Sequence, residues 1–366
     1  MDSCDVLIVG GGPAGSSCAW KLRNSGLCVV LMDKQLFPRD KVCGGWITPE
    51  VLKELEISPS EYAAGRILQP ITGFRTGNIG KACVETNYGR IVSYGIRRRE
   101  FDDYLLKRSG AALDLGTSLN TLERSGSEWI VNGQFRAKLI VGAGGHFCPV
   151  ARLTGAKRGE ENPVVAQEAE FKMDSEEAAS CQVRPEIPEL YFCADMKGYG
   201  WCFRKENFLN VGLGRMDRHR LHDHVTNFLS FLKSAGRVPF ELPANPLGHA
   251  YLLGGFKARA HVGDGYLLAG DAAGLAYPQS GEGIRPAIES GLEAAKTILA
   301  AKGCYTRQAL ESYRQAIAAR CASTNGWAVA IGRRLPDRLI RALAQPLMSS
   351  HSFARRVILD RWFLHA

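Results

Sequence analysis

The stretch Asp5-Val-Leu-Ile-Val-Gly-Gly-Gly-Pro-Ala-Gly15 decides the fold of this chain of 366 residues. Its apolar start predicts a buried strand that leads directly into a glycine turn, and a helix-compatible run continues to Ser25. A second apolar run, residues 28–32, ends on Asp33. Strand, glycine turn, helix and second strand follow one another in the order of a dinucleotide-binding βαβ unit.

Each residue of the turn has a mechanical reason. Gly10, Gly12 and Gly15 fill the pattern G-x-G-x-x-G. The first permits the tight turn, the second lets a pyrophosphate approach the backbone, and the third lets the helix pack closely on the strand. Pro13 suits a first helical turn, where its missing N–H would have no partner. Together with Ala14 it opens a helix whose free N–H groups can bind phosphate.

The acid after the second strand completes this site. Asp33 stands eighteen residues after the last glycine, where a carboxylate can accept a hydrogen bond from a ribose hydroxyl, and Lys34 follows it. With both strands, the helix and the acid in place, a dinucleotide site is favoured over a purely structural turn. This stretch leaves open which dinucleotide binds.

Composition places the chain among ordinary globular proteins. Hydrophobic residues make up 45% and charged residues 23%. The first strand begins almost at the N-terminus, so no signal peptide is expected, and no run approaches the roughly 20 apolar residues of a spanning helix. The eleven cysteines form no C-x-x-C pair, so neither a disulfide framework nor a zinc site is indicated. We therefore expect a cytoplasmic protein.

The net charge of +9 is concentrated towards the C-terminus. From Arg333 onward the chain has seven Arg against two Asp, and leucines recur at 335, 339 and 343. This pattern predicts a basic amphipathic helix. It can pack on the protein body with a solvated basic face, or rest on an anionic membrane as a peripheral contact at the inner face. Nucleic acid is not expected as a partner, since no binding motif accompanies the charge.

A second glycine-rich motif lies about 255 residues after the first. Residues 266–269 form a short apolar run, followed by Gly270-Asp271, then Gly281, Gly283 and a helical run from Ile284 to residue 301. The combination resembles the FAD-dependent family of aromatic hydroxylases, flavin halogenases and geranylgeranyl reductases, which share a glutathione-reductase-like FAD fold. The resemblance implies that Asp271 binds the ribityl chain and that residues 281–284 face the flavin. FAD is therefore the expected cofactor.

Two further segments agree with this family. Residues 96–105 resemble its R-x-x-F-D-x-x-L helix start, which implies that Arg98 contacts the cofactor; a solvated charge run is the alternative. Residues 138–145 match the strand before its G-A-D-G turn, but Gly144 stands where the family usually has Asp. That difference argues against a hydroxylase-type interaction with nicotinamide, although NAD(P)H or another donor can still supply electrons transiently.

The segment 38–45, Pro-Arg-Asp-Lys-Val-Cys-Gly-Gly, resembles the geranylgeranyl reductase branch. The resemblance implies that Arg39, Cys43, Gly44 and Gly45 lie close to the flavin. Cys43 follows two basic residues, so its thiol would sit in an electropositive site. An inert structural cysteine is the alternative.

The segment 198–203, Gly-Tyr-Gly-Trp-Cys-Phe, resembles the Y-x-W-x-F-P signature of the same branch. Alternation along a strand places Tyr199, Trp201 and Phe203 on one face, which makes an aromatic wall suited to an apolar chain or a flat ring. A sheet that packs on its own core would show the same pattern. Arg204 replaces the proline of the signature, so the match is incomplete.

These motifs give an α/β architecture with three parts. A discontinuous FAD-binding Rossmann domain is expected over 1–70, 95–155 and 255–302, a strand-rich substrate domain over 71–94 and 156–254, and a helical C-terminal region over 303–366. No metal is expected, because the histidines at 219, 222 and 224 stand among arginines that would repel a cation.

The sequence thus predicts an FAD-dependent oxidoreductase. The leading hypothesis is hydride transfer from reduced flavin to a C=C bond of an isoprenoid or similar apolar, lipid-like substrate, with Cys43, Tyr199 and Trp201 lining the site. The alternative is a flavin monooxygenase or halogenase acting on an aromatic or polyketide substrate, and a non-catalytic flavin-binding protein is a third reading. The sequence identifies neither the proton donor nor the electron donor.

Overall fold

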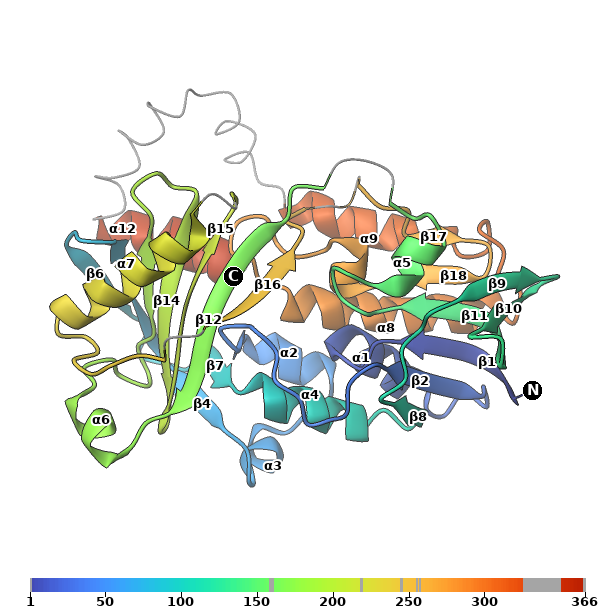
Figure 1. Cartoon of the computed structure of the whole chain (residues 1–366), viewed down its shortest axis with the longest axis horizontal. Helices are drawn as coiled ribbons and strands as arrows, with labels where there is room; N and C mark the ends of the chain where they lie inside the picture. Colours follow the sequence, from blue (N-terminus) through green and yellow to red (C-terminus); the bar gives the residue numbers. More distant parts are fainter. Residues whose placement is uncertain are drawn as a thin grey trace. The chain divides into compact units, whose positions relative to one another are not determined.

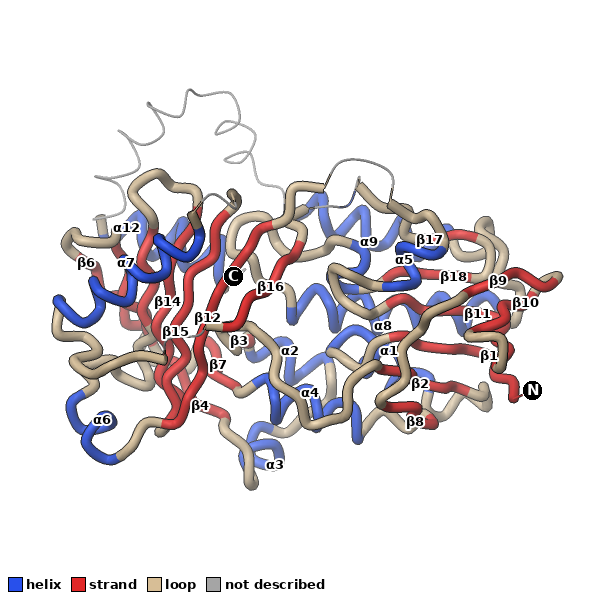
Figure 2. The backbone as a smooth tube through the Cα atoms, viewed as in Figure 1, coloured by secondary structure: helices blue, strands red, loops and turns tan. Residues whose placement is uncertain are grey.

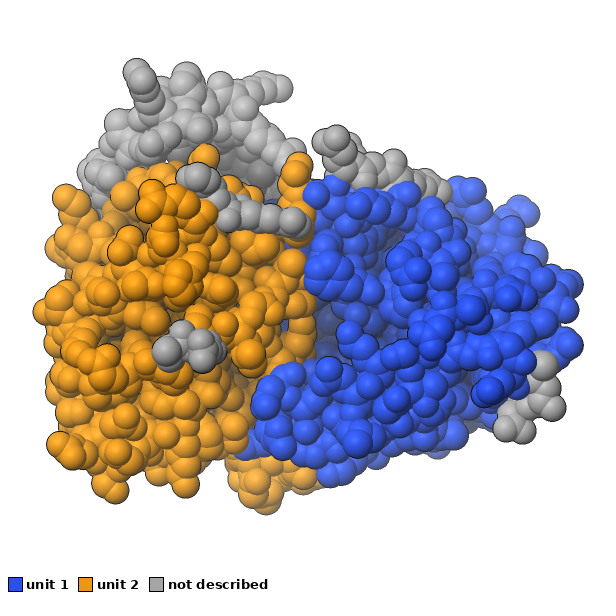
Figure 3. Space-filling view, viewed as in Figure 1, with its two compact units in different colours: residues 1–40, 99–161, 251–326 blue, residues 41–98, 162–250, 327–366 orange. Residues whose placement is uncertain are grey.

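The computed structural model describes residues 2–157, 161–217, 220–243, 246–254, 256, 258–324 and 350–364. The chain divides into two compact units (Figure 3). Unit 1 comprises residues 1–40, 99–161 and 251–326, and unit 2 comprises residues 41–98, 162–250 and 327–366. The finer domain boundaries given above stay a prediction.

Strands and helices are interspersed along the chain, with several runs of consecutive strands (Figure 1). The described helices are α1 (Pro13–Leu22), α2 (Pro49–Glu54), α3 (Pro59–Ala63), α4 (Arg98–Lys107), α5 (Pro149–Leu153), α6 (Ser175–Ser180), α7 (Leu221–Ser234), η2 (Gly270–Ala273), α8 (Ile284–Ala301), α9 (Glu311–Thr324), α12 (His351–Phe353) and the π-helix η3 (Ala354–Phe363). The described strands are β1 (Asp2–Val9), β2 (Val29–Asp33), β3 (Trp46–Ile47), β4 (Leu68–Ile71), β5 (Gly73–Asn78), β6 (Cys83–Asn87), β7 (Ser93–Ile96), β8 (Ala112–Leu115), β9 (Leu122–Ser125), β10 (Glu128–Val131), β11 (Phe135–Gly142), β12 (Val164–Lys172), β13 (Glu189–Phe192), β14 (Gly198–Lys205), β15 (Phe208–Arg215), β16 (Leu247–Tyr251), β17 (Val262–Gly263) and β18 (Tyr266–Leu268).

Unit 1 is built on an eight-stranded sheet with the order β17-β18-β11-β1-β2-β8, which β10 and β9 extend from β11 (Figure 2). β1 pairs in parallel with β2 and β11, β2 with β8, and β11 with β18. The β1 residues Val6, Leu7 and Ile8 are fully buried, as expected for a parallel strand covered on both faces. The predicted Rossmann-like α/β fold is confirmed.

Helices α1 and α8 cross in direct contact within unit 1. A Cβ atom added at Gly291 of α8 would lie 2.1 Å from the carbonyl oxygen of Ala14 in α1. Gly270 contributes to the same junction, because its Cβ would lie 3.1 Å from the Ala14 Cβ, and its N–H donates to Ser290 Oγ at 2.9 Å. The two glycine motifs, far apart in sequence, therefore adjoin through Ala14.

Unit 2 carries a seven-stranded sheet with the order β16-β12-β15-β14-β13-β5-β6, and a smaller sheet β3-β7-β4. Helix α7 packs on one face of the large sheet, where Tyr191, Cys202 and Phe228 share a buried core. Gly200 makes room for this helix, because a Cβ there would lie 2.6 Å from the Phe228 ring. The strand-rich character predicted for the second part of the fold is confirmed.

The described C-terminal residues pack within unit 2. Phe363 of η3 is 1% exposed and stacks on Trp46, with ring centroids 5.3 Å apart. Asp360 accepts a hydrogen bond of 2.6 Å from the Tyr88 hydroxyl. The predicted basic amphipathic helix over 335–347 lies outside the described residues. Among the described helices, none is long and apolar enough to cross a membrane.

We expect Gly291→Ala to destabilise the protein by about 1–3 kcal/mol, because the new methyl group has no room against the Ala14 carbonyl and α1 must shift. Gly248→Ala is the matched control, since the nearest atom to its Cβ is 4.0 Å away. Thermal melting of both variants provides the measurement. Equal melting temperatures for Gly291→Ala and the wild type would contradict the assigned contact.

Candidate functional site

The three glycines of the first turn divide into two kinds. Gly10 has φ +117°, and a Cβ there would lie 2.4 Å from the Ala143 carbonyl oxygen. A Cβ at Gly15 would lie 1.9 Å from the Gly10 carbonyl oxygen. By contrast, a Cβ at Gly12 would approach no protein atom more closely than Arg39 Nη2, at 3.6 Å. Gly10 and Gly15 are therefore required by the protein itself, whereas Gly12 leaves a vacant space at the start of α1.

Asp33 lies at the end of β2, as predicted, and its carboxylate already supports the turn. Oδ2 accepts the N–H of Gly11 at 2.7 Å, and Oδ1 accepts the N–H of Gln35 at 2.8 Å. A carboxylate oxygen has two acceptor positions, so both oxygens keep capacity for a further donor such as a ribose hydroxyl. Lys34 beside it is exposed.

Arg39 provides the positive charge beside the vacant space at Gly12. Its Nη1 pairs with Asp102 Oδ2 of α4 at 3.2 Å, and Asp102 is fully buried. Asp102 therefore holds the Arg39 side chain in place. The sequence motif over residues 96–105 includes Asp102, but the sequence analysis assigned no role to it. Arg98, the first residue of α4, is 8% exposed rather than part of a solvated charge run.

The residues of the second glycine motif also lie close to one another. Gly270 has φ +60° and is the first residue of η2. A Cβ at Gly283 would lie 3.2 Å from Asp271 Oδ1, so Asp271 and Gly283, both predicted to contact the cofactor, lie side by side. Gly281 has φ +72°, a conformation that an L side chain rarely adopts. Ile284 begins α8 and is buried, and the predicted helix over 284–301 is confirmed.

Arg259 is a site residue that the sequence analysis missed. It is 6% exposed, and its Nη1 donates to the Ala272 carbonyl at 2.8 Å while its Nη2 donates to the His146 carbonyl at 2.9 Å. Glu161 neutralises it through Nε at 2.6 Å. Arg259 therefore ties the Gly270–Ala273 turn to the segment that follows Gly144. No sequence motif marks it, because its partners are mostly backbone carbonyls.

These features of unit 1 fit FAD. The start of α1 has no side-chain cap, so its first N–H groups are available to a phosphate. The vacant space at Gly12 with Arg39 beside it suits a pyrophosphate. Asp33 and Asp271 are carboxylates placed at the two motifs where the resemblance predicts ribose and ribityl hydroxyls.

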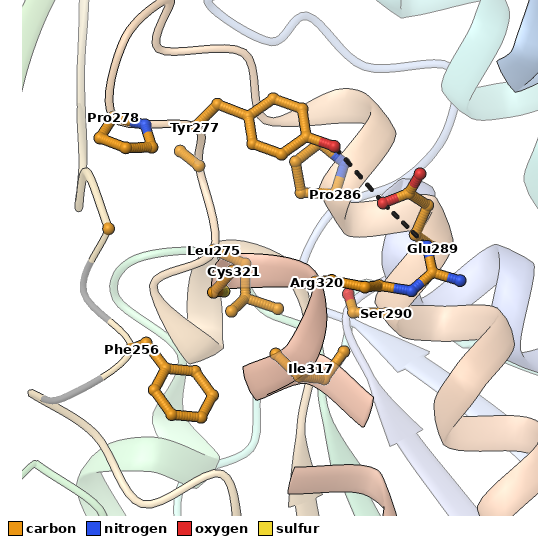
Figure 4. Close-up of a pocket in the computed structure, with 12 residues that line it drawn as sticks. Phe256, Leu275, Tyr277, Pro278, Pro286, Glu289, Ser290, Ile317, Arg320 and Cys321 are labelled. Atoms are coloured by element: carbon orange, nitrogen blue, oxygen red, sulfur yellow. Dashed lines mark hydrogen bonds and ion pairs between the residues drawn. The ribbon is translucent and has the colours of Figure 1, made fainter. Parts of the chain in front are cut away.

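A pocket behind the second motif was not predicted (Figure 4). It lies between α8, α9 and the loop after η2 and has a cavity volume of about 50 Å³. Leu275, Phe256 and Ile317 give it apolar walls. At its polar side Glu289 accepts from Tyr277 Oη at 3.5 Å and pairs with Arg320 at 3.0 Å and with Arg285 at 2.9 Å. These contacts fix Tyr277 within the loop that leads to Gly281.

In unit 2, the Cys43–Gly45 loop is held from several directions. The Cys43 carbonyl accepts from Asn210 Nδ2 at 3.2 Å, and Asn210 Oδ1 accepts from Trp201 Nε1 at 2.7 Å. A Cβ at Gly44 would lie 3.3 Å from the Phe203 ring, and Gly45 has φ +66° with its Cβ position 2.2 Å from the Ile96 carbonyl oxygen. The structure thus brings the loop of Cys43 and Gly44 together with Trp201, and their role at the flavin stays a prediction.

The aromatic wall is present but partly covered. Tyr199, Trp201 and Phe203 lie on the face of β14 opposite Cys202, and the Tyr199 and Trp201 ring centroids are 6.1 Å apart. Phe363 packs edge-on against Tyr199, with centroids 5.5 Å apart. No pattern in the sequence indicates this contact, because Tyr199 and Phe363 lie far apart along the chain.

Two carboxyls of β12 lie beside this loop and have opposite protonation behaviour. Burial raises the pKa of Glu168 from 4.5 to about 7, although the Cys43 N–H, Lys205 and Asn210 oppose the shift. Burial acts in the same direction on Glu170, but Lys205 at 2.8 Å, Asn210 and Arg97 at 3.1 Å hold its pKa below the ordinary value. Neither residue was identified from sequence, because an acid on a strand carries no motif.

Comparison with known proteins supports this interpretation of the fold. A family model described as an NAD(P)-binding Rossmann-like domain matches residues 8–66. The chain is 28% identical over 310 residues to the digeranylgeranylglycerophospholipid reductase of Methanocaldococcus jannaschii, covering 80% of this chain and 75% of that protein. It is 27% identical over 315 residues to the geranylgeranyl diphosphate reductase of Rhodobacter capsulatus, covering 81% and 75%.

Solved structures agree. A geranylgeranyl bacteriochlorophyll reductase-like protein from Thermoplasma acidophilum superposes with a TM-score of 0.80 at 23% identity, covering 99% of this chain and 97% of that one. The halogenase PltM, solved in complex with FAD, superposes with a TM-score of 0.71 at 17% identity, covering 96% and 78%. These superpositions show the same fold, and the predicted resemblance is confirmed. FAD, which the PltM structure contains, fits the residues described above.

We expect Gly12→Ala to fold normally and to bind FAD at least about tenfold more weakly, equivalent to about 1.4 kcal/mol, because its methyl group enters the vacant space and meets the pyrophosphate. Gly15→Ala should instead lower the melting temperature of the apoprotein, since its methyl group collides with the backbone. FAD titration and apoprotein melting separate the two effects. Wild-type FAD affinity in a folded Gly12→Ala variant would contradict the prediction that the pyrophosphate occupies the space at Gly12.

The raised pKa of Glu168 predicts a pH dependence of stability. The folded protein binds this proton more tightly than the unfolded chain, so the contribution is complete below about pH 4.5 and is lost as the pH rises through about 7. The loss amounts to at most about 3 kcal/mol. Glu168→Gln should flatten this part of the curve, measured by urea unfolding at several pH values. An unchanged slope in the variant would count against the buried acid.

Proposed function

We propose that this chain is an FAD-dependent reductase that saturates a carbon–carbon double bond of an isoprenoid or a similarly apolar, lipid-like substrate. The observation that carries the proposal is the Cys43–Gly45 loop. It has the segment of the geranylgeranyl reductase branch, and it is fixed against the aromatic strand that bears the second signature of that branch. Relatives named as reductases of geranylgeranyl compounds support the same substrate class.

The residues of unit 1 hold the cofactor in this proposal. The N–H groups at the start of α1 and the Arg39 guanidinium bind the pyrophosphate, while Asp33 and Asp271 accept from the ribose and the ribityl chain. Lys34, Gly144 and Gly281–Gly283 complete the proposed cofactor contacts of unit 1. Bound FAD, once reduced, supplies a hydride. NAD(P)H or another physiological donor reduces it.

The residues of unit 2 act on the substrate. Trp201 is 8% exposed and fixed by Asn210, so its ring is a rigid apolar surface that orients an isoprenoid chain. Tyr199 extends that surface, and Cys43 lies at its edge through the contacts of its loop. Apolar side chains exclude water, which protects the reacting carbons and the hydride from side reactions. The basic C-terminal segment provides a peripheral contact with the membrane in which such substrates reside.

Anaerobic single turnover tests the function. Holoenzyme reduced with dithionite is mixed, without oxygen, with geranylgeranyl diphosphate, and the return of the oxidised flavin absorbance is followed together with the mass of the product. We expect oxidation of the flavin and a product heavier by two hydrogens per double bond reduced. A matched sample without geranylgeranyl diphosphate controls for leakage of oxygen.

Dependence on oxygen distinguishes the alternative. A monooxygenase or halogenase would leave the flavin reduced until oxygen is admitted and would then yield an oxygenated or halogenated product. That result would replace the reductase proposal. A bound flavin that no physiological donor reduces and no acceptor reoxidises would favour a non-catalytic flavin-binding protein.

A further inference from the structure

The pocket shown in Figure 4 lies within unit 1 and has no part in the proposed function. Its walls are mostly apolar and come chiefly from three elements, represented by Leu275 of the loop after η2, Pro286 of α8 and Ile317 of α9. Its volume of about 50 Å³ has room for about three to five groups of the size of a water molecule or a methyl group, at roughly 10–15 Å³ each.

The polar side chains at the edge of this pocket already have protein partners. Glu289 is neutralised by two arginines, at 2.9 and 3.0 Å, and accepts a hydrogen bond from Tyr277 Oη. Ser290 Oγ donates to a carbonyl of the preceding helical turn at 3.0 Å and accepts the Gly270 N–H at 2.9 Å. A water molecule in a cavity needs several polar partners, and these side chains are already engaged. The pocket therefore suits an uncharged, apolar group better than water or an ion.

Three contacts hold the walls of the pocket apart. Arg320 of α9 pairs with Glu289 of α8, and the fully buried Tyr313 of α9 donates to the last carbonyl of β18 at 2.7 Å. On the loop side, the Gly254 N–H donates to the Ala276 carbonyl at 3.1 Å. The pocket cannot collapse without the loss of these contacts. An apolar space that cannot collapse leaves its lining atoms without van der Waals partners, and an apolar group of matching size restores them.

Tyr277 connects this pocket with the loop that is predicted to face the flavin. Its side chain lines the pocket, while its N–H donates to the Glu282 carbonyl at 2.9 Å and its carbonyl accepts the Gly281 N–H at 2.9 Å. Gly283, at the end of the same loop, accepts an N–H of α8 at 3.0 Å and lies beside Asp271. A group that supports Tyr277 from the pocket side therefore also supports the backbone of the predicted flavin loop.

Size and chemistry together indicate the end of an apolar chain as the ligand. A single isoprene unit is branched, uncharged and free of polar atoms, and it is of the size that the pocket admits. The pocket is partly open, so the rest of a longer molecule can remain outside it. A diphosphate or another charged headgroup does not fit, because the two arginines at the edge already share the Glu289 carboxylate.

We propose that this pocket binds the branched apolar end of an isoprenoid, and that this ligand and FAD strengthen each other's binding. The choice of an isoprenoid rests on the proposed function, whereas the apolar character of the site follows from its lining and its size. The coupling follows from Tyr277, which the pocket and the predicted flavin loop share. The factor by which the ligand raises the affinity for FAD must equal the factor by which FAD raises the affinity for the ligand.

Titration of the full-length apoprotein with isoprene in sealed tubes, followed by saturation-transfer NMR, tests the site. We expect saturable binding that is tighter than the binding of n-pentane. Cys321→Leu places a branched apolar side chain in the pocket from α9, so this variant should bind isoprene at least about tenfold more weakly. Cys304→Leu is the matched control and should bind like the wild type, because Cys304 is exposed and is not a lining residue.

Titration with FAD, in the presence and absence of saturating isoprene, tests the coupling. Isoprene should tighten FAD binding at least about fivefold in the wild type and in Cys304→Leu, and the holoprotein should bind isoprene more tightly than the apoprotein by the same factor. The FAD affinity of Cys321→Leu should not respond to isoprene, since its own side chain occupies the pocket.

Each negative result overturns a defined part of the proposal. A wild type without saturable isoprene binding, or a folded Cys321→Leu variant that binds isoprene as the wild type does, would overturn the site. Isoprene binding that leaves the FAD affinity unchanged would overturn the coupling, and tighter binding of n-pentane would overturn the choice of an isoprenoid. None of these measurements involves turnover, so their results are distinguishable from a failure of the anaerobic reduction that tests the proposed function.

Discussion

The close crossing of α1 and α8 is the constraint on which unit 1 depends. Gly291 has no side chain, so the second helix can approach to the carbonyl oxygen of Ala14 in the first helical turn. Gly270 adjoins the same residue and is anchored to α8 through Ser290. Any larger residue at this crossing would separate the turn that offers N–H groups to a pyrophosphate from the turn that carries Asp271. Helix packing thus brings two distant glycine motifs together in unit 1.

The glycines of the first motif show how stability and binding are divided among residues of one type. Gly10 and Gly15 are required because neighbouring backbone atoms occupy the space of a side chain. Gly12 is different, since its surroundings would admit a methyl group and only Arg39 lies near. No described atom prevents a side chain at Gly12, which agrees with the prediction that a pyrophosphate occupies this space. Arg39 is in turn held by the buried Asp102.

In unit 2 the acidic side chains of the large sheet differ in the cations that neutralise them. Its large sheet buries several acids, and each has a distinct arrangement of neighbours. Glu189 is neutralised by Arg237 and Glu170 by Lys205 and Arg97, so both are structural ion pairs that would be costly to break. Glu168 has no paired cation among the described residues, and burial raises its pKa to about 7. Asn210 connects the Cys43–Gly45 loop to Trp201, because its amide donates to the Cys43 carbonyl and accepts from the Trp201 indole.

The sequence by itself determined the Rossmann-like fold and the positions of the two glycine motifs, and through them it predicted FAD as the cofactor. These features follow from local rules, because a strand, a tight turn and a helix N-terminus each need particular residues at fixed spacing. The tertiary structure alone decided the roles of Arg259, Asp102 and Glu168, and the cover that Phe363 provides for Tyr199. Such roles depend on burial and on partners far away in sequence, and a buried arginine or glutamate looks the same in a sequence as one on the surface. Periodicity records which face of an element is apolar, whereas the pKa of a carboxyl depends on which charges are near it after folding.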